Sequence, residues 1–211
     1  MGKTFTVQKT LEAAGYVDLS NLADFESEAV INKAKTYTMV KGYSTAKGLY
    51  RTLFDLNNSV IVFDDCDDVL KDQTALNLLK GALDSNGRRI ISWRADMRDE
   101  DLPRSFEFTG RIIFISNLDQ SRIDQAIRSR SMMIDLTMTD DQKIDRMAHI
   151  AKESDFMPEF ELDAKDDALN LIRELKDSAK EISLRTLISV TKIRAAGDED
   201  WKGLAEYILC A

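Results

Sequence analysis

The sequence has few of the residues that most often carry metal or nucleophile chemistry. It contains two cysteines, Cys66 and Cys210, and one histidine, His149, which we expect at the surface. So few cysteine and histidine residues exclude a Cys/His zinc cluster, a Ser/His or Cys/His catalytic triad and a disulfide framework. A signal peptide and a long apolar run are also missing from the sequence. We therefore expect a cytoplasmic protein that does not associate with membranes.

Positive charge is outnumbered by negative charge and is unevenly placed. The net charge of -8 argues against indiscriminate binding along nucleic acid or anionic membranes. No lysine lies between Lys80 and Lys143, and the cations of that stretch, from Arg88 to Arg130, are all arginine. Arginines in this density favour fixed contacts with phosphate or carboxylate groups. The alternative is that neighbouring acids such as Glu107 neutralise them.

The order of the expected elements changes along the chain. We expect strands at 36–40, 59–63, 111–116 and 132–136, a hairpin from 89–93 and 105–108, and helices at 4–14, 46–56 and 75–83. After residue 139 only helical patterns follow, at 140–153, 163–179, 183–196 and 199–209. This order predicts an α/β domain with a parallel sheet over 1–138 and a small all-α domain over 139–211.

Gly2-Lys3-Thr4, directly before the first expected helix, matches the end of the phosphate-binding loop G-x-x-x-x-G-K-[ST]. In such a loop the backbone N–H groups surround a β-phosphate, the lysine reaches the β- and γ-phosphates, and the hydroxyl binds Mg²⁺. A tripeptide also arises by chance, so the alternative is an ordinary N-terminus. The motif therefore gains weight only from the rest of the chain.

Polar residues follow two of the expected buried strands. Asp64 and Asp65 end the first apolar run, and Asn117 follows the second. A carboxylate at a strand end can hold Mg²⁺, while a second carboxylate and an amide can position an attacking water. The simpler readings are an acidic turn and an asparagine that opens a turn. Further along, Arg128 and Arg130 precede the last expected strand; like Arg185 in the helical part, they could be surface cations.

Taken in this order, the motifs resemble those of the AAA+ ATPases over nearly the whole chain. The matches are Gly2-Lys3-Thr4 to the end of Walker A, Val60-Ile61-Val62-Phe63-Asp64-Asp65 to Walker B, Ser116-Asn117 to sensor 1, Arg130 to the arginine finger with Arg128 as its alternative, and Arg185 to sensor 2. The resemblance implies a P-loop NTPase core with a five-stranded sheet ordered 5-1-4-3-2, followed by a small all-α lid.

The family resemblance also implies a function and a set of site residues. The cofactors would be ATP and Mg²⁺, and the protein would be an ATP-hydrolysing remodelling motor or loader that forms a homo-oligomeric ring and acts on protein or DNA. The implied roles are nucleotide binding by Gly2, Lys3, Thr4 and Arg185, magnesium binding by Thr4 and Asp64, and catalysis by Asp65, Asn117, Arg130 and Arg128.

The chain departs from the family pattern at two places. Walker B motifs of the family usually end Asp-Glu, and Asp65 is one methylene shorter than that glutamate. In addition, the family has a central strand before the phosphate loop, so we expect this chain to lack its first strand, to be a fragment or to receive that half separately, and to bind ATP weakly or not at all. Two alternatives stay open: a non-catalytic AAA+ remnant or regulatory subunit, and a clamp-loader-like scaffold associated with DNA.

Overall fold

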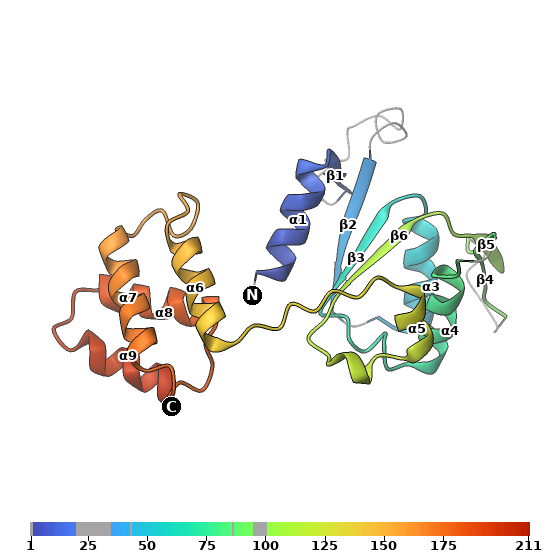
Figure 1. Ribbon diagram of the computed structural model, residues 1–211. Helices are drawn as coiled ribbons and strands as arrows, with labels where there is room; N and C mark the ends of the chain where they lie inside the picture. Colours follow the sequence, from blue (N-terminus) through green and yellow to red (C-terminus); the bar gives the residue numbers. More distant parts are fainter. Residues whose placement is uncertain (1, 20–34, 43, 86, 95–100) are drawn as a thin grey trace. The chain divides into compact units, whose positions relative to one another are not determined.

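The computed structural model describes residues 2–19, 35–42, 44–85, 87–94 and 101–211. The chain divides into two compact units, of which one comprises residues 3–134 and the other comprises residues 135–211 together with the N-terminal end (Figure 1). Residues 20–34 and the tip of the predicted hairpin, residues 95–100, lie outside the described residues.

A parallel sheet organises the first unit. Its strands are β1 (Tyr16–Asp18), β2 (Lys35–Lys41), β3 (Val60–Asp64) and β6 (Arg111–Ile115), in the order β1-β2-β3-β6. All three pairings are parallel, which confirms the predicted α/β class with a parallel sheet. Every residue of β3 is buried, as expected for a strand that is covered on both faces.

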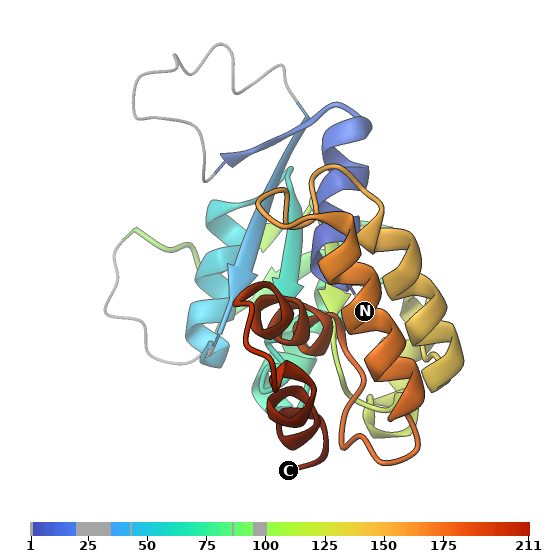
Figure 2. The same cartoon turned by 90° about the vertical axis from the view of Figure 1, so that its left-hand side faces the viewer.

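Helices cover both faces of this sheet. On one face α1 (Lys3–Ala13) packs Leu11 against Val60 and Val62 of β3. On the other face Ile61 and Phe63 of the same strand pack against α3 (Ala46–Asp55), α4 (Gln73–Ala82) and α5 (Gln125–Arg130), the last preceded by the 3-10 turn η2 (Gln120–Arg122). Figure 2 shows α1 and α3 on opposite sides of the strands. Because successive side chains of β3 point to opposite faces of the sheet, this strand contributes to both apolar clusters.

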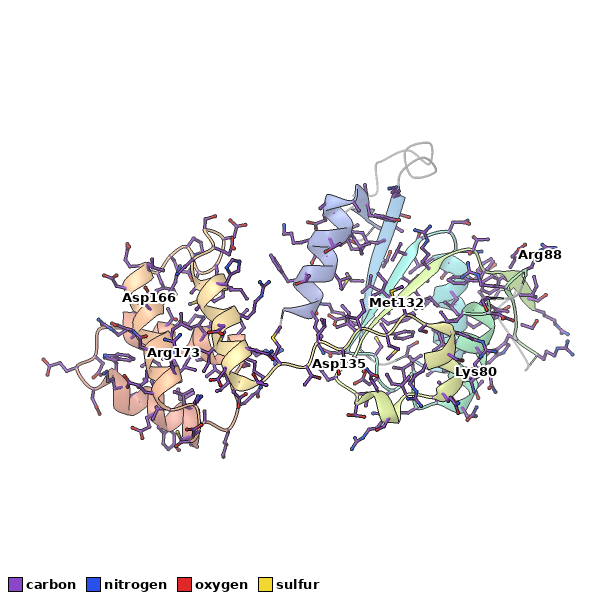
Figure 3. The ribbon with its side chains drawn as sticks, viewed as in Figure 1. Lys80, Arg88, Met132, Asp135, Asp166 and Arg173 are labelled. Atoms are coloured by element: carbon purple, nitrogen blue, oxygen red, sulfur yellow. The ribbon has the colours of Figure 1, made fainter. Side chains whose placement is uncertain are left out.

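A small antiparallel pair, β4 (Ile90–Ser92) and β5 (Ser105–Glu107), confirms the predicted hairpin strands. Phe106 of β5 packs edge-on against Tyr50 and Phe54 of α3. Arg88, labelled in Figure 3, pairs with Glu107 of the partner strand and holds the pKa of that carboxyl below its usual range. A neighbouring acid therefore neutralises Arg88, which is the alternative to a contact with phosphate.

The predicted strand at 132–136 is wrong. These residues form no strand, and their apolar side chains are largely exposed, with Met132 at 90% and Ile134 at 72%. Met132 lies on the extended chain that follows α5 (Figure 3). Residues with strand propensity form a strand only where a neighbour pairs their backbone groups. No described strand pairs with this segment.

The second unit is helical. Its helices are α6 (Asp140–Ala151), α7 (Leu162–Glu174), α8 (Leu184–Ala195) and α9 (Trp201–Cys210). They share one apolar cluster, whose fully buried members include Met147, Ile172 and Leu187. A capping box between Thr139 and Gln142 begins α6. Among the described residues no helix is both long enough and apolar enough to cross a membrane.

Gly110, between β5 and β6, yields a test of this packing. A Cβ there would lie 2.8 Å from the Phe108 ring and 2.9 Å from the carbonyl oxygen of Ser59. We expect Gly110→Ala to lower the free energy of unfolding by about 1–3 kcal/mol, because the backbone oxygen cannot move without disturbing the sheet. Urea unfolding followed by Trp93 fluorescence, in a Trp201→Phe background, measures it.

Gly81→Ala is the matched control, since a Cβ at this helical glycine would meet only the carbonyl oxygen of Ile90, at 3.7 Å. It should leave stability unchanged or raise it by up to about 1 kcal/mol, because alanine favours the helix. A Gly110→Ala protein as stable as its parent would show that the close contact is relieved without cost.

Candidate functional site

The candidate site lies where β3 and β6 end and α1 begins. The two strands pair in register from Val60 and Arg111 to Asp64 and Ile115, so their carboxyl ends lie at one edge of the sheet. The N–H of Asp65 then donates to the carbonyl oxygen of Ile115 at 3.2 Å, which extends the pairing by one residue. In parallel α/β sheets this edge is where ligands bind.

Asp64 is the buried anion of the site. Its residue is 5% exposed, and the Thr4 hydroxyl at the start of α1 lies 3.0 Å from each of its carboxylate oxygens. The Lys41 ammonium lies 3.6 Å from Oδ2. A buried carboxylate requires such partners, because its desolvation is otherwise costly. The contact of Thr4 with Asp64 therefore ties the first turn of α1 to the end of β3.

A chain of hydrogen bonds joins the remaining polar groups at this edge. Lys3 Nζ donates to Asn117 Oδ1 at 2.6 Å and to the carbonyl oxygen of Ser116 at 2.7 Å. The amide nitrogen of Asn117 donates to Asp65 Oδ1 at 3.2 Å. Because the lysine can only donate and the carboxylate only accept, these contacts fix the orientation of the amide. Asp65 has a left-handed backbone, with φ 54°.

The structure thus brings Lys3, Thr4, Asp64, Asp65 and Asn117 together, as the motifs predict. Among the described residues no group of three or more His, Cys, Asp or Glu could enclose a metal ion. A divalent ion at Asp64 would therefore have one carboxylate and the Thr4 hydroxyl as its protein ligands. Mg²⁺ suits such a set, since it commonly binds one or two carboxylates and completes its shell with water and phosphate oxygens.

Of the other predicted site residues, the two arginines of α5 do not join this cluster. Gly2 precedes α1 with φ 68°, a conformation that favours glycine. Arg128 and Arg130 are exposed on α5, where Arg130 donates to the carbonyl oxygen of Ala126 at 3.0 Å. In the described ranges no hydrogen bond or ion pair links either arginine to the cluster. Arg185 is exposed in the first turn of α8, in the second unit.

Sequence reasoning missed two residues at this edge. Lys41, beside Asp64, ends the strand predicted at 36–40, so the rule that singled out Asp64 and Asn117 also applies to it. Asp67 accepts from the Ser116 hydroxyl at 2.6 Å and thereby holds the turn that carries Asn117. In the sequence Asp67 is one of several acidic residues in a row. The sequence alone does not distinguish such a run from a turn exposed to solvent.

Cys66 lies directly behind the acidic residues. Its thiol is buried and donates to the carbonyl oxygens of Val40 at 3.4 Å and Asp64 at 3.5 Å. Burial raises the pKa of the Cys66 thiol, and the nearby carboxylates, Asp64 among them, raise it further. The thiol therefore stays protonated at neutral pH and belongs to the packing behind the site rather than to its reactive groups.

The raised thiol pKa predicts a loss of stability at alkaline pH. The folded protein holds the proton of Cys66 more tightly than the unfolded chain does, so this contribution is complete below the ordinary thiol pKa of about 8.5 and is lost above it. The midpoint of thermal unfolding should therefore fall between about pH 7 and about pH 9.5, and fall less in Cys66→Ala. Cys210→Ala, in the other unit, is the control and should keep the full decrease. Equal decreases in all three proteins would contradict the assignment.

Comparison with known proteins gives one informative match. No protein-family model matches the sequence. The chain is 28% identical, over 226 residues, to an uncharacterized 36.7 kDa protein encoded in the nrdC-mobD intergenic region of Enterobacteria phage T4. The match covers 97% of this chain and 64% of the phage protein. The chain is thus similar to nearly two thirds of a longer phage protein whose name states no activity.

Proposed function

We propose that this chain is the nucleotide-binding core and helical lid of an ATPase of the AAA+ type, acting on Mg²⁺-ATP. One observation carries the proposal: two neighbouring sets of hydrogen bonds, one from Lys3 and one from Thr4, join the start of α1 to the carboxyl ends of β3 and β6. Their members are Lys3, Thr4, Asp64, Asp65 and Asn117. Their contacts span up to 114 residues of sequence, so local chain geometry does not produce them.

The charges of the cluster suit a metal-bound triphosphate. Lys3 is held by two neutral oxygens, and a phosphate oxygen is a stronger acceptor for an ammonium group than either. Thr4 and Asp64 offer the hard oxygen ligands that Mg²⁺ prefers. Bound Mg²⁺-ATP would supply the phosphoanhydride bond to be hydrolysed. These residues fit the cofactor, and Gly2-Lys3-Thr4 matches the last three residues of the phosphate-loop motif.

Each residue then has a defined task. Lys3 neutralises phosphate charge, and Thr4 with Asp64 holds the metal ion. Asp65 and Asn117 are in direct contact, so the pair presents a carboxylate and an amide side by side to a water molecule. In this proposal Arg130, exposed on α5, completes the site of a neighbouring subunit in a ring, with Arg128 as the alternative. In the same proposal Arg185 keeps the nucleotide-binding role that the AAA+ resemblance gives it.

A non-catalytic, nucleotide-binding role is the second candidate. The observation that favours it is the short Asp65 side chain, which already accepts from Asn117 at 3.2 Å. A carboxylate held back in this way is a weaker partner for an attacking water. ATP binding that depends on Lys3, without turnover, would assign this second role.

The assignment predicts that Lys3→Ala and Asp64→Ala each abolish ATP turnover. The loss should be at least about 10²-fold, because each substitution removes a charge aimed at the reacting groups. Turnover is measured in a form of the protein with a complete glycine-rich loop before Gly2. Lys9→Ala is the matched control, since Lys9 is also on α1 but pairs with Glu12 at the surface. Unchanged turnover in both site variants would refute the assignment.

A residue that acts across a subunit interface should affect hydrolysis more than binding. Arg130→Ala should leave ATP affinity near wild type, while turnover falls by about 10³–10⁵. Mixing it with the inactive Lys3→Ala protein should restore part of the activity, because one subunit supplies Lys3 and the other supplies Arg130. Arg122→Ala, an exposed arginine of η2, should stay active alone. If the mixture assembles but stays inactive, the role passes to Arg128 or is dropped.

A further inference from the structure

Helix α9 of the second unit is apolar on two faces, and its own unit covers only one of them. Ala205 and Leu209 are buried in the apolar cluster of that unit. On the other side Leu204 is 51% exposed, Tyr207 is 73% exposed and Ile208 is 53% exposed. No other described helix carries more than one exposed large apolar side chain. The outer face of α9 is therefore unusual within this molecule.

The three exposed side chains form one stripe along the helix, here called the α9 stripe. Residues three and four apart are neighbours on a helix surface, and Tyr207 and Ile208 follow Leu204 at these spacings. Of the ten residues of α9, only Lys202 and Glu206 are charged. A helix that is apolar all round is normally buried all round. The composition of α9 is thus that of a helix with a partner on its outer face.

The charges beside the stripe are negative. The Asp200 carboxylate, just before α9, has its oxygens 2.8 and 3.1 Å from the Cβ position of Gly203. Gly203 lies one turn before Tyr207, so this carboxylate stands at the N-terminal end of the stripe. It makes no capping hydrogen bond to the helix. Glu206 is exposed three residues after Gly203 and borders the stripe on one side.

The nearest cation does not neutralise these two carboxylates. The Lys202 ammonium lies over the Trp201 ring, 5.9 Å from its centroid. The surroundings are acidic as well, because residues 135–211 contain 18 acidic and 11 basic residues and so hold nearly all of the net charge of -8. A partner of the α9 stripe therefore meets an apolar surface with a negative border, which is complementary to a positively charged partner.

From these observations we propose that the α9 stripe binds a basic amphipathic helix of a partner protein. Rows of side chains on one helix fit the grooves of another, so the apolar face of the partner packs on the stripe. Lysine or arginine side chains at its edge pair with Asp200 and Glu206. A second copy of this chain fits less well, because it would set one acidic unit against another.

This binding surface is independent of the proposed ATPase function. None of its residues belongs to the hydrogen-bonded site at the start of α1, and the argument uses contacts within the second unit alone. Loss of ATP turnover in the Lys3 and Asp64 variants would therefore leave the proposal unchanged, and peptide binding is measured without nucleotide.

Fluorescence anisotropy with three labelled peptides tests the proposal on the full chain. The first peptide has leucines at helical spacings of three and four residues and lysines elsewhere. The second has glutamates in place of the lysines, and the third is a scrambled form of the first without an apolar face. The lysine peptide should bind saturably and at least about tenfold more tightly than either of the others, a difference of about 1.4 kcal/mol. Absence of saturable binding would overturn the proposal, as would equal binding of the scrambled peptide, because net charge alone would then explain it.

Two pairs of variants test whether the peptide binds at the stripe. Tyr207→Ala should weaken the lysine peptide at least about tenfold, whereas Leu162→Ala, which removes an exposed apolar side chain of α7, should not. Glu206→Lys should weaken it more than Glu174→Lys, which makes the same change of charge at an exposed residue of α7. Circular dichroism checks that each variant keeps its helices.

The outcome of these comparisons decides the occupant of the stripe. Equal weakening by the two members of either pair would contradict the assigned surface. Sedimentation of the wild-type chain as a dimer that Tyr207→Ala converts to a monomer, without binding of the lysine peptide, would overturn the proposal in favour of a second copy.

Discussion

Parallel, in-register pairing of β3 with β6 is the constraint on which the candidate site depends. Because Asp64 is the partner of Ile115, the residues that follow each strand emerge at the same edge of the sheet. The bond from the Asp65 N–H to Ile115 then holds the two turns together. A shift of one residue in this register would move Asn117 by about 3.3 Å, which is more than a hydrogen bond allows.

The burial of β3 on both faces explains why its polar site residue lies at its carboxyl end. The side chains of β3 alternate between the cluster under α1 and the larger cluster under α3, α4 and α5. A buried polar group without a partner costs roughly 1–3 kcal/mol, and a charged group costs more, so a carboxylate on this strand needs partners. Asp64 is tolerated because Thr4 and Lys41 reach it from neighbouring elements. The anion of the site is thus also a structural tie between α1, β2 and β3.

Local patterns predicted much of this arrangement. An apolar run that ends in Asp64-Asp65 predicts a buried strand and a polar edge, and the sheet has both. The run at 132–136 shows the limit of such reasoning, because its side chains favour a strand but no described strand pairs with it. The strand-end rule also places Lys41 at this edge, whereas its pairing with Asp64 depends on strand order, which a single strand does not encode.

Tertiary information also decides the roles of the arginines. Arg88 and Arg130 belong to one Arg-only stretch of sequence, yet Arg88 is bound to Glu107, whereas Arg130 donates to the carbonyl oxygen of Ala126 within its own helix. Charge type alone could not separate a neutralised cation from one that is exposed. The distinction depends on which side chain the fold places opposite each of them.

The backbone of Asp65 limits how this site could change by mutation. Its positive φ of 54° is a conformation that glycine, asparagine and aspartate adopt most readily. A glutamate here would gain reach toward a water but would lose the short side chain that suits a left-handed residue. The shorter acid is therefore coupled to the turn after β3, and lengthening it would require that turn to relax as well.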